Sequence, residues 1–141
     1  MCLYQQCYSI NLKAGDEKME KIHTDKAPAA VGPYSQAIAA NGMLYTSGQI
    51  PLDPQTGAIT GKNIKEQAEQ VMKNLMAVLE AAGTNAGKVV KTLCFLTDMN
   101  DFAAFNEVYA RYFTEKPARS CVEVSALPKG ALCEVELVAV I

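Results

Sequence analysis

The 141-residue sequence lacks several features on which protein function is often built. It has no tryptophan and a single histidine, His23, which excludes a metal site made of several histidines. It has no apolar run approaching the roughly 18 residues of a membrane-spanning helix. Basic residues are not in excess, because 13 Lys and Arg stand against 15 Asp and Glu, giving a net charge of -2. The overall charge therefore provides no basis for binding nucleic acid or an anionic membrane.

Common catalytic and redox motifs are also missing. The sequence contains no P-loop, no G-x-S-x-G, no H-E-x-x-H and no Cys-x-x-Cys. Its five cysteines are an odd number, and Cys94, Cys121 and Cys133 lie in apolar, strand-like runs. This pattern predicts reduced thiols in a cytoplasmic protein rather than a framework of disulfides.

The composition is that of a globular domain. Half of the residues are hydrophobic and one fifth are charged, and the length suits one domain. Residues 1–18 have neither the apolar run of a secretory signal nor the arginine-rich composition of a transit peptide. We expect residues 1–18 to be an extension outside the core and residues 19–141 to form a single domain.

Hydrophobic periodicity predicts two helices and five strands. Asn41-Gly42 is the strongest two-residue hairpin signal, so the flanking residues 35–40 and 43–49 are predicted to pair. Apolar residues spaced by threes and fours predict helices over 63–82 and 101–114. Asn63 is expected to cap the first helix, with Glu66 in the capping-box position. The remaining strands are expected over 87–97, 118–125 and 131–141, with a short sixth strand near 18–23.

This order predicts an α+β fold, in which two helices pack on one face of a mixed β-sheet. The strand over 87–97 is apolar on both faces in its second half, so its second face also needs a cover. The sequence holds no third helix for that purpose. A second copy of the same chain is the simplest cover, which predicts a homo-oligomer.

Polar side chains share one face of the strand over 118–125. Period-two alternation places Arg119, Cys121, Glu123 and Ser125 on the same side. A guanidinium is suited to bidentate capture of a carboxylate or phosphate. The structural alternative is a salt bridge from Arg119 to Glu123 or to an acid at an interface.

Four further residues are candidates for a binding or catalytic site. Glu134 shares a strand face with Glu136, and a carboxylate facing a pocket would activate water, whereas two acids at an exposed edge need no function. Ser47 and Gly48 stand where a strand gives way to a loop, so a hydroxyl and backbone N–H groups are free for an anion. Tyr34 is a polar aromatic residue in a rigid Gly-Pro-Tyr loop, where packing is the alternative role.

Taken together, four stretches resemble the reactive intermediate deaminase family, also named RidA or YjgF and formerly described as endoribonuclease L-PSP. The stretches are APAAVGPYSQAI (27–38), LYTSGQIPLDPQTG (44–57), KTLCFLTDMNDF (91–102) and PARSCVEVSALPKGALCEVELVAV (117–140). The resemblance covers about residues 20–141, and the stretch over 117–140 is similar to the family signature.

The resemblance implies a chorismate-mutase-like homotrimer, with sheets around a central barrel and sites in the clefts between subunits. It also implies hydrolysis of 2-imino acids, the enamine and imine products of pyridoxal-phosphate-dependent dehydratases, to 2-keto acids and ammonia. No metal or organic cofactor is expected. Alternative functions are an endoribonuclease or translation inhibitor, disfavoured by the acidic composition, and a non-catalytic module that binds a small carboxylate.

The resemblance also implies roles for individual residues. Arg119 would hold the substrate carboxylate, and Glu134 would position or activate the water. The pocket would be lined by Tyr34, Ser47, Gly48 and Cys121. If the last two strands paired as a hairpin, Arg119 and Glu134 would lie roughly 13 Å apart along them. They would then share a substrate only through a long arginine reach, a bulge, or residues from different subunits.

Overall fold

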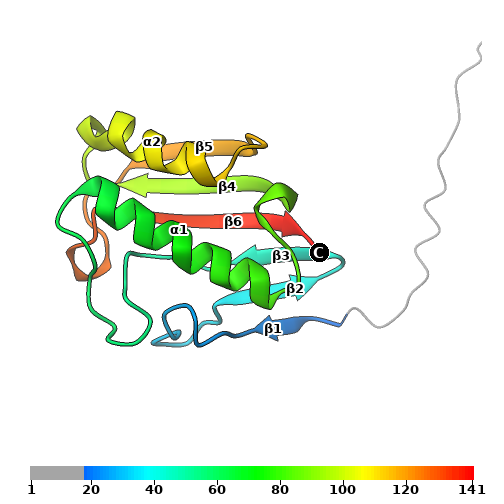
Figure 1. Ribbon diagram of the computed structural model, residues 1–141. Coiled ribbons are helices and arrows are strands. Elements are labelled where there is room, and N and C mark those ends of the chain that lie inside the picture. Colours follow the sequence, from blue (N-terminus) through cyan, green and yellow to red (C-terminus); the bar gives the residue numbers. More distant parts are fainter. Residues whose placement is uncertain (1–17) are drawn as a thin grey trace, which may run out of the picture.

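A computed structural model describes residues 18–141, so the predicted extension lies almost entirely outside the described residues. One mixed sheet has the strand order β1-β2-β3-β6-β4-β5 (Figure 1). The strands are β1 (Glu20–Ile22), β2 (Ala37–Ala40), β3 (Met43–Thr46), β4 (Val89–Leu96), β5 (Ala118–Glu123) and β6 (Cys133–Val140). The helices are α1 (Ile64–Ala81) and α2 (Phe102–Tyr112), with 3-10 turns at Ala86–Lys88, Met99–Asp101 and Pro128–Gly130.

The β2–β3 hairpin forms at the predicted Asn-Gly turn. Asn41 and Gly42 both have a left-handed φ, of 52° and 74°, as a two-residue hairpin turn requires. The chain leaves β3 at Thr46, and Gln49 then forms an isolated bridge with Val135 of β6. This bridge holds the segment after β3 against β6, which brings Gly48 close to Glu134.

Helix α1 begins at the predicted cap. The Asn63 side chain accepts a hydrogen bond from the backbone N–H of Glu66 (3.0 Å). The Glu66 carboxylate does not complete a capping box, because it accepts from the backbone N–H of Lys62 (2.7 Å) instead of that of Asn63. Within residues 18–141, neither helix combines the length and the apolar character needed to cross a lipid bilayer.

Both helices lie on one face of the sheet, as the element order predicted (Figure 1). The core between the two layers is apolar, and its largest fully buried side chains include Leu44, Met72, Leu75, Leu79, Leu96, Phe105 and Leu137. No helix of residues 18–141 covers the opposite face. Tyr45 and Val122 on that face are 48% and 42% exposed. Its covering by a second copy of the chain stays a prediction.

Strands β5 and β6 do not form a hairpin, so that arrangement is wrong. β5 pairs in parallel with β4, with Arg119 level with Thr92. β6 lies between β3 and β4 and is antiparallel to both. Because β4 and β5 are parallel, the chain passes from one to the other through α2. Strand β4 therefore separates β5, which carries Arg119, from β6, which carries Glu134.

Candidate active site

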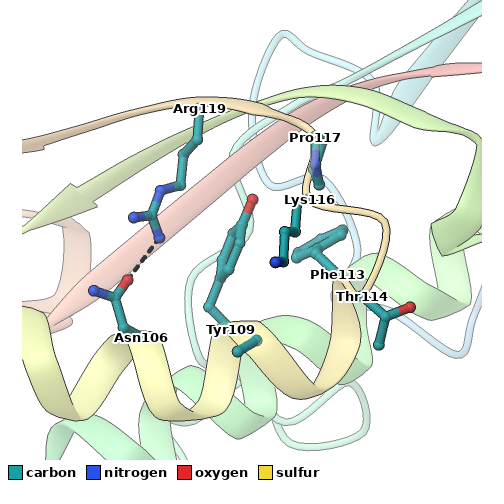
Figure 2. A pocket seen from close by; sticks show the side chains of 8 residues that line it. Asn106, Tyr109, Phe113, Thr114, Lys116, Pro117 and Arg119 are labelled. Atoms are coloured by element: carbon teal, nitrogen blue, oxygen red, sulfur yellow. Dashed lines mark hydrogen bonds between the residues drawn. The ribbon is translucent and has the colours of Figure 1, made fainter.

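Arg119 points to the helix-covered side of the sheet, towards α2. Its Nη1 donates a hydrogen bond to Oδ1 of Asn106 (2.7 Å), and its guanidinium carbon lies 4.7 Å from the ring centre of Tyr109 (Figure 2). Glu123 does not form the alternative salt bridge, because its carboxylate accepts from the backbone N–H of Met99 (2.6 Å). The guanidinium therefore has neutral neighbours that orient it and leave its charge available to an anion.

A cavity of about 310 Å³ opens beside this arginine, between α2 and the start of β5. Figure 2 shows Arg119, Asn106 and Tyr109 along one side of it, with Phe113 and Lys116 along the other. The half-buried guanidinium is thus accessible from solvent.

Cys121 shares the face of Arg119 and lies level with Cys94 of β4. Burial raises the pKa of the Cys121 thiol above its ordinary value, and the charge of Arg119 offsets this only in part. The thiol is therefore protonated at neutral pH, which does not favour a role as nucleophile. Cys121 does not line the cavity beside Arg119, so its predicted place in the pocket stays a prediction.

The other predicted residues gather around a second cavity, of about 510 Å³, where the C-terminal end of β3 lies beside the N-terminal end of β6. We call it the Glu134 cavity. Tyr34, Ser47, Gly48, Glu134 and Glu136 line it. The Ser47 hydroxyl donates to the backbone oxygen of Ser35 (2.6 Å), so it secures the loop that carries Tyr34. Ser47 retains its oxygen lone pairs for a ligand, while its proton is already used.

Glu134 packs directly against Gly48. A Cβ built on Gly48 would lie 1.8 Å from Oε1 of Glu134 and 2.7 Å from its Cδ. The φ of Gly48 is not left-handed, so space rather than backbone conformation requires glycine here. The carboxylate occupies the room that any other side chain at position 48 would fill.

The environment of Glu134 favours its protonated form. Burial of the half-exposed carboxyl raises its pKa, and repulsion by Glu136 two residues along the same strand face raises it further. A carboxylate with a raised pKa is a stronger base towards water than a solvated one. The group is therefore suited to accept a proton from water and to return it.

Arg119 and Glu134 of one chain lie on opposite faces of the sheet. Arg119 is level with Leu137, which is buried under the helices, whereas Glu134 is three residues away on the same strand. An odd spacing along a strand reverses the face. Two strand spacings across and three residues along separate the two Cα atoms by about 14 Å. The chain thus divides the predicted residues into an Arg119–Cys121 group and a Tyr34–Ser47–Gly48–Glu134 group.

The structure adds three residues to the arginine group. The amide oxygen of Asn106 accepts a hydrogen bond from the guanidinium, while the rings of Phe102 and Tyr109 lie within 5.5 Å of the central carbon of the guanidinium. Asn106 follows Phe102 by four residues and precedes Tyr109 by three, so it is a polar residue on the apolar stripe of the helix. A polar residue within an apolar helix stripe was therefore the sequence signal from which Asn106 could have been predicted.

A model of the protein family described as Endoribonuclease L-PSP matches residues 24–141. A protein of Synechocystis, named RutC family protein slr0709, is 60% identical over 126 residues, or 87% of this chain and 97% of that protein. The 2-iminobutanoate/2-iminopropanoate deaminase of Salmonella typhimurium is 50% identical over 123 residues, or 84% of this chain and 95% of that protein.

Solved structures show the same fold. The structure of E. coli TdcF with bound serine matches with a TM-score of 0.83 and 44% sequence identity. It covers 86% of this chain, and 98% of the TdcF chain is matched. The six-stranded mixed sheet with two helices is therefore the α+β arrangement of these relatives.

Proposed function

The chain belongs to the Endoribonuclease L-PSP family, and from that membership we propose that it is a deaminase hydrolysing 2-imino acids to 2-keto acids and ammonia. The observation that carries this proposal is the half-buried Glu134 carboxylate, held against Gly48 at an open cavity. The Salmonella relative named 2-iminobutanoate/2-iminopropanoate deaminase supports it. A carboxylate so placed would act on water, which is the second reactant of this hydrolysis.

The chemistry needs few groups. One water molecule adds to the imine carbon, forming a C–O bond, while its proton passes to Glu134. The carboxyl then returns that proton to the nitrogen, which gives a carbinolamine. Glu134 next takes the proton of the new hydroxyl and passes it to the nitrogen, so that the C–N bond breaks and ammonia leaves as the C=O bond of the keto acid forms. No bond to the protein is required, which suits a protonated Cys121 thiol. The guanidinium of Arg119 would hold the substrate carboxylate.

We propose that each site combines two copies of the chain. Arg119 and Glu134 lie on opposite faces and about 14 Å apart within one chain, which is too far for one small substrate. A homotrimer would place the Arg119 group of one subunit beside the Glu134 group of the next. It would also cover the sheet face that carries the exposed Tyr45 and Val122. The reduced thiols favour a cytoplasmic location.

A coupled assay tests the activity. A serine or threonine dehydratase generates the imine, and its decay is followed with and without this protein. We expect the protein to accelerate the decay in proportion to its concentration. Binding of the keto acid without acceleration would favour a non-catalytic binding module, and RNA binding that weakens steeply with salt would favour the nuclease that the family description names.

Glu136→Gln is expected to move the acid limb of the pH profile of kcat/KM to lower pH. Glu136 repels the charged form of Glu134 and so raises its pKa. Removing that repulsion lowers this pKa, and the base form then persists to lower pH. Glu136→Asp keeps the charge and serves as the matched control, with its limb near that of the unmodified protein. An acid limb that stays in place in Glu136→Gln would remove Glu134 as its source.

A further inference from the structure

We propose that an apolar cavity next to the Glu134 cavity holds the side chain of the substrate, so that the protein prefers 2-imino acids with large apolar side chains. We name this cavity the side-chain pocket. Its apolar lining is formed by Pro28, Ala29, Val31, Ile50, Leu52 and Pro128. The inference rests on the proposed deaminase function and adds the class of substrate.

The side-chain pocket and the Glu134 cavity are neighbours. Tyr34, Gly48, Ile50 and Pro128 line both of them. A substrate whose imine carbon lies beside Glu134 would therefore have the side-chain pocket within reach of its next carbon atoms. The substrate carboxylate would point away from it, towards an arginine supplied by another subunit.

The buried amide of Gln36, which lines the side-chain pocket, is already used. Gln36 is buried, and its amide nitrogen donates to the backbone oxygens of Thr24 (3.0 Å), Ala27 (3.3 Å) and Pro28 (2.8 Å). Its amide oxygen accepts from the backbone N–H of Thr24 (2.7 Å). Throughout residues 18–141, no buried side-chain nitrogen or oxygen lacks a hydrogen-bond partner. Gln36 thus asks for no polar group from the ligand, and it fixes the Pro28 wall of the pocket in advance.

Lys129 is the one charged residue among those that line this pocket. Its Nζ donates to the backbone oxygen of Gly57 (2.8 Å), and the residue is exposed, so its charge lies at the rim. Inside this rim the lining residues carry no positive charge to pair with an acidic side chain, so burying one there costs free energy. An imine derived from glutamate is consequently expected to be a poor substrate.

The size of the pocket indicates how large the side chain is. Its volume of about 300 Å³ is at the lower end of small-molecule sites. An isobutyl or benzyl group fits within this space and fills more of it than a methyl group, which would leave most of it unfilled. Each additional methylene in a hydrophobic pocket is worth at least about tenfold in specificity.

The experiment compares imines derived from alanine, leucine, phenylalanine and glutamate, generated by an L-amino-acid oxidase, with the full chain as catalyst. Ala29→Trp fills the pocket from its exposed rim, and Leu52→Ala enlarges it. Ala81→Trp, on an exposed position at the end of α1, is the matched control. We expect kcat/KM for the leucine-derived imine to exceed that for the alanine-derived imine by at least about tenfold.

Ala29→Trp should reduce this leucine-to-alanine ratio by about tenfold or more, while Ala81→Trp should leave it unchanged. Leu52→Ala should shift preference towards the still larger phenylalanine-derived imine. Unaltered ratios in both pocket variants, or a preference for the glutamate-derived imine, would overturn this inference and leave the deaminase standing. No acceleration of any imine by the unmodified protein would overturn the deaminase and this inference together.

Discussion

Arg119→Ala is expected to lower kcat/KM for imine hydrolysis by at least about 10²-fold, because in the proposed site it would remove two charged hydrogen bonds to the substrate carboxylate. The fold should persist, since the side chain is half-buried and its loss removes one hydrogen bond, to Asn106, and the contact with the Tyr109 ring. The coupled assay measures the rate, and thermal unfolding reports the fold.

Two comparisons decide how Arg119 acts. Arg119→Lys keeps the positive charge and loses the planar pair of donors, so an intermediate rate is expected. Asn106→Ala removes the partner that orients the guanidinium, which should raise KM more than it lowers kcat. Full activity in Arg119→Ala would remove the arginine from the site.

A mixing experiment tests whether the site is shared between subunits. The Arg119→Ala and Glu134→Gln variants are each expected to be inactive. When equal amounts are unfolded and reassembled together, about a quarter of the sites receive an intact arginine from one chain and an intact glutamate from the next. The double variant mixed with either single variant is the control and should recover nothing. Absence of recovery in the first mixture would place both residues of a site in one chain.

Local signals predicted the elements of this fold because their causes are local. Asn41-Gly42 adopts the two left-handed conformations of its turn, and Asn63 accepts the hydrogen bond that begins α1. Strand pairing depends on the whole chain instead. Nothing near residues 118–141 indicates that β4 enters between β5 and β6, and so the hairpin considered there is wrong.

The sequence offered the candidate site as single residues and not as an arrangement. Polar side chains in apolar strands marked Arg119 and Glu134 as candidates, and their roles stay predictions, while their opposite faces follow only from the register through β4. The Ser47 hydroxyl illustrates the same limit. Its donor is used by Ser35, a contact between residues twelve positions apart that no local pattern specifies.

Gly48→Ala is expected to lower kcat/KM by about 10²-fold or more while costing little stability. The new methyl would lie 1.8 Å from Oε1 and 2.9 Å from Cγ of Glu134. The conflict is with a flexible side chain rather than with backbone, so rotation of Glu134 relieves it. A displacement of about 1 Å of a reacting group is enough for a loss of this size.

Gly87→Ala is the matched control for this substitution. Gly87 also has a φ outside the left-handed region. It lies in an exposed 3-10 turn and lines neither the cavity beside Arg119 nor the Glu134 cavity. Its replacement should leave kcat/KM unchanged.

The Glu134→Ala background separates displacement of the carboxylate from damage to the loop after β3. In that background the Gly48 methyl meets no carboxylate, so adding Gly48→Ala should lower the rate no further and leave Tm unchanged. A second loss of rate in the double variant would mean that Gly48 serves the substrate directly, through its backbone. Full activity in the single Gly48→Ala variant would exclude Glu134 as the group that acts on water, because its carboxylate does not keep its position beside an alanine.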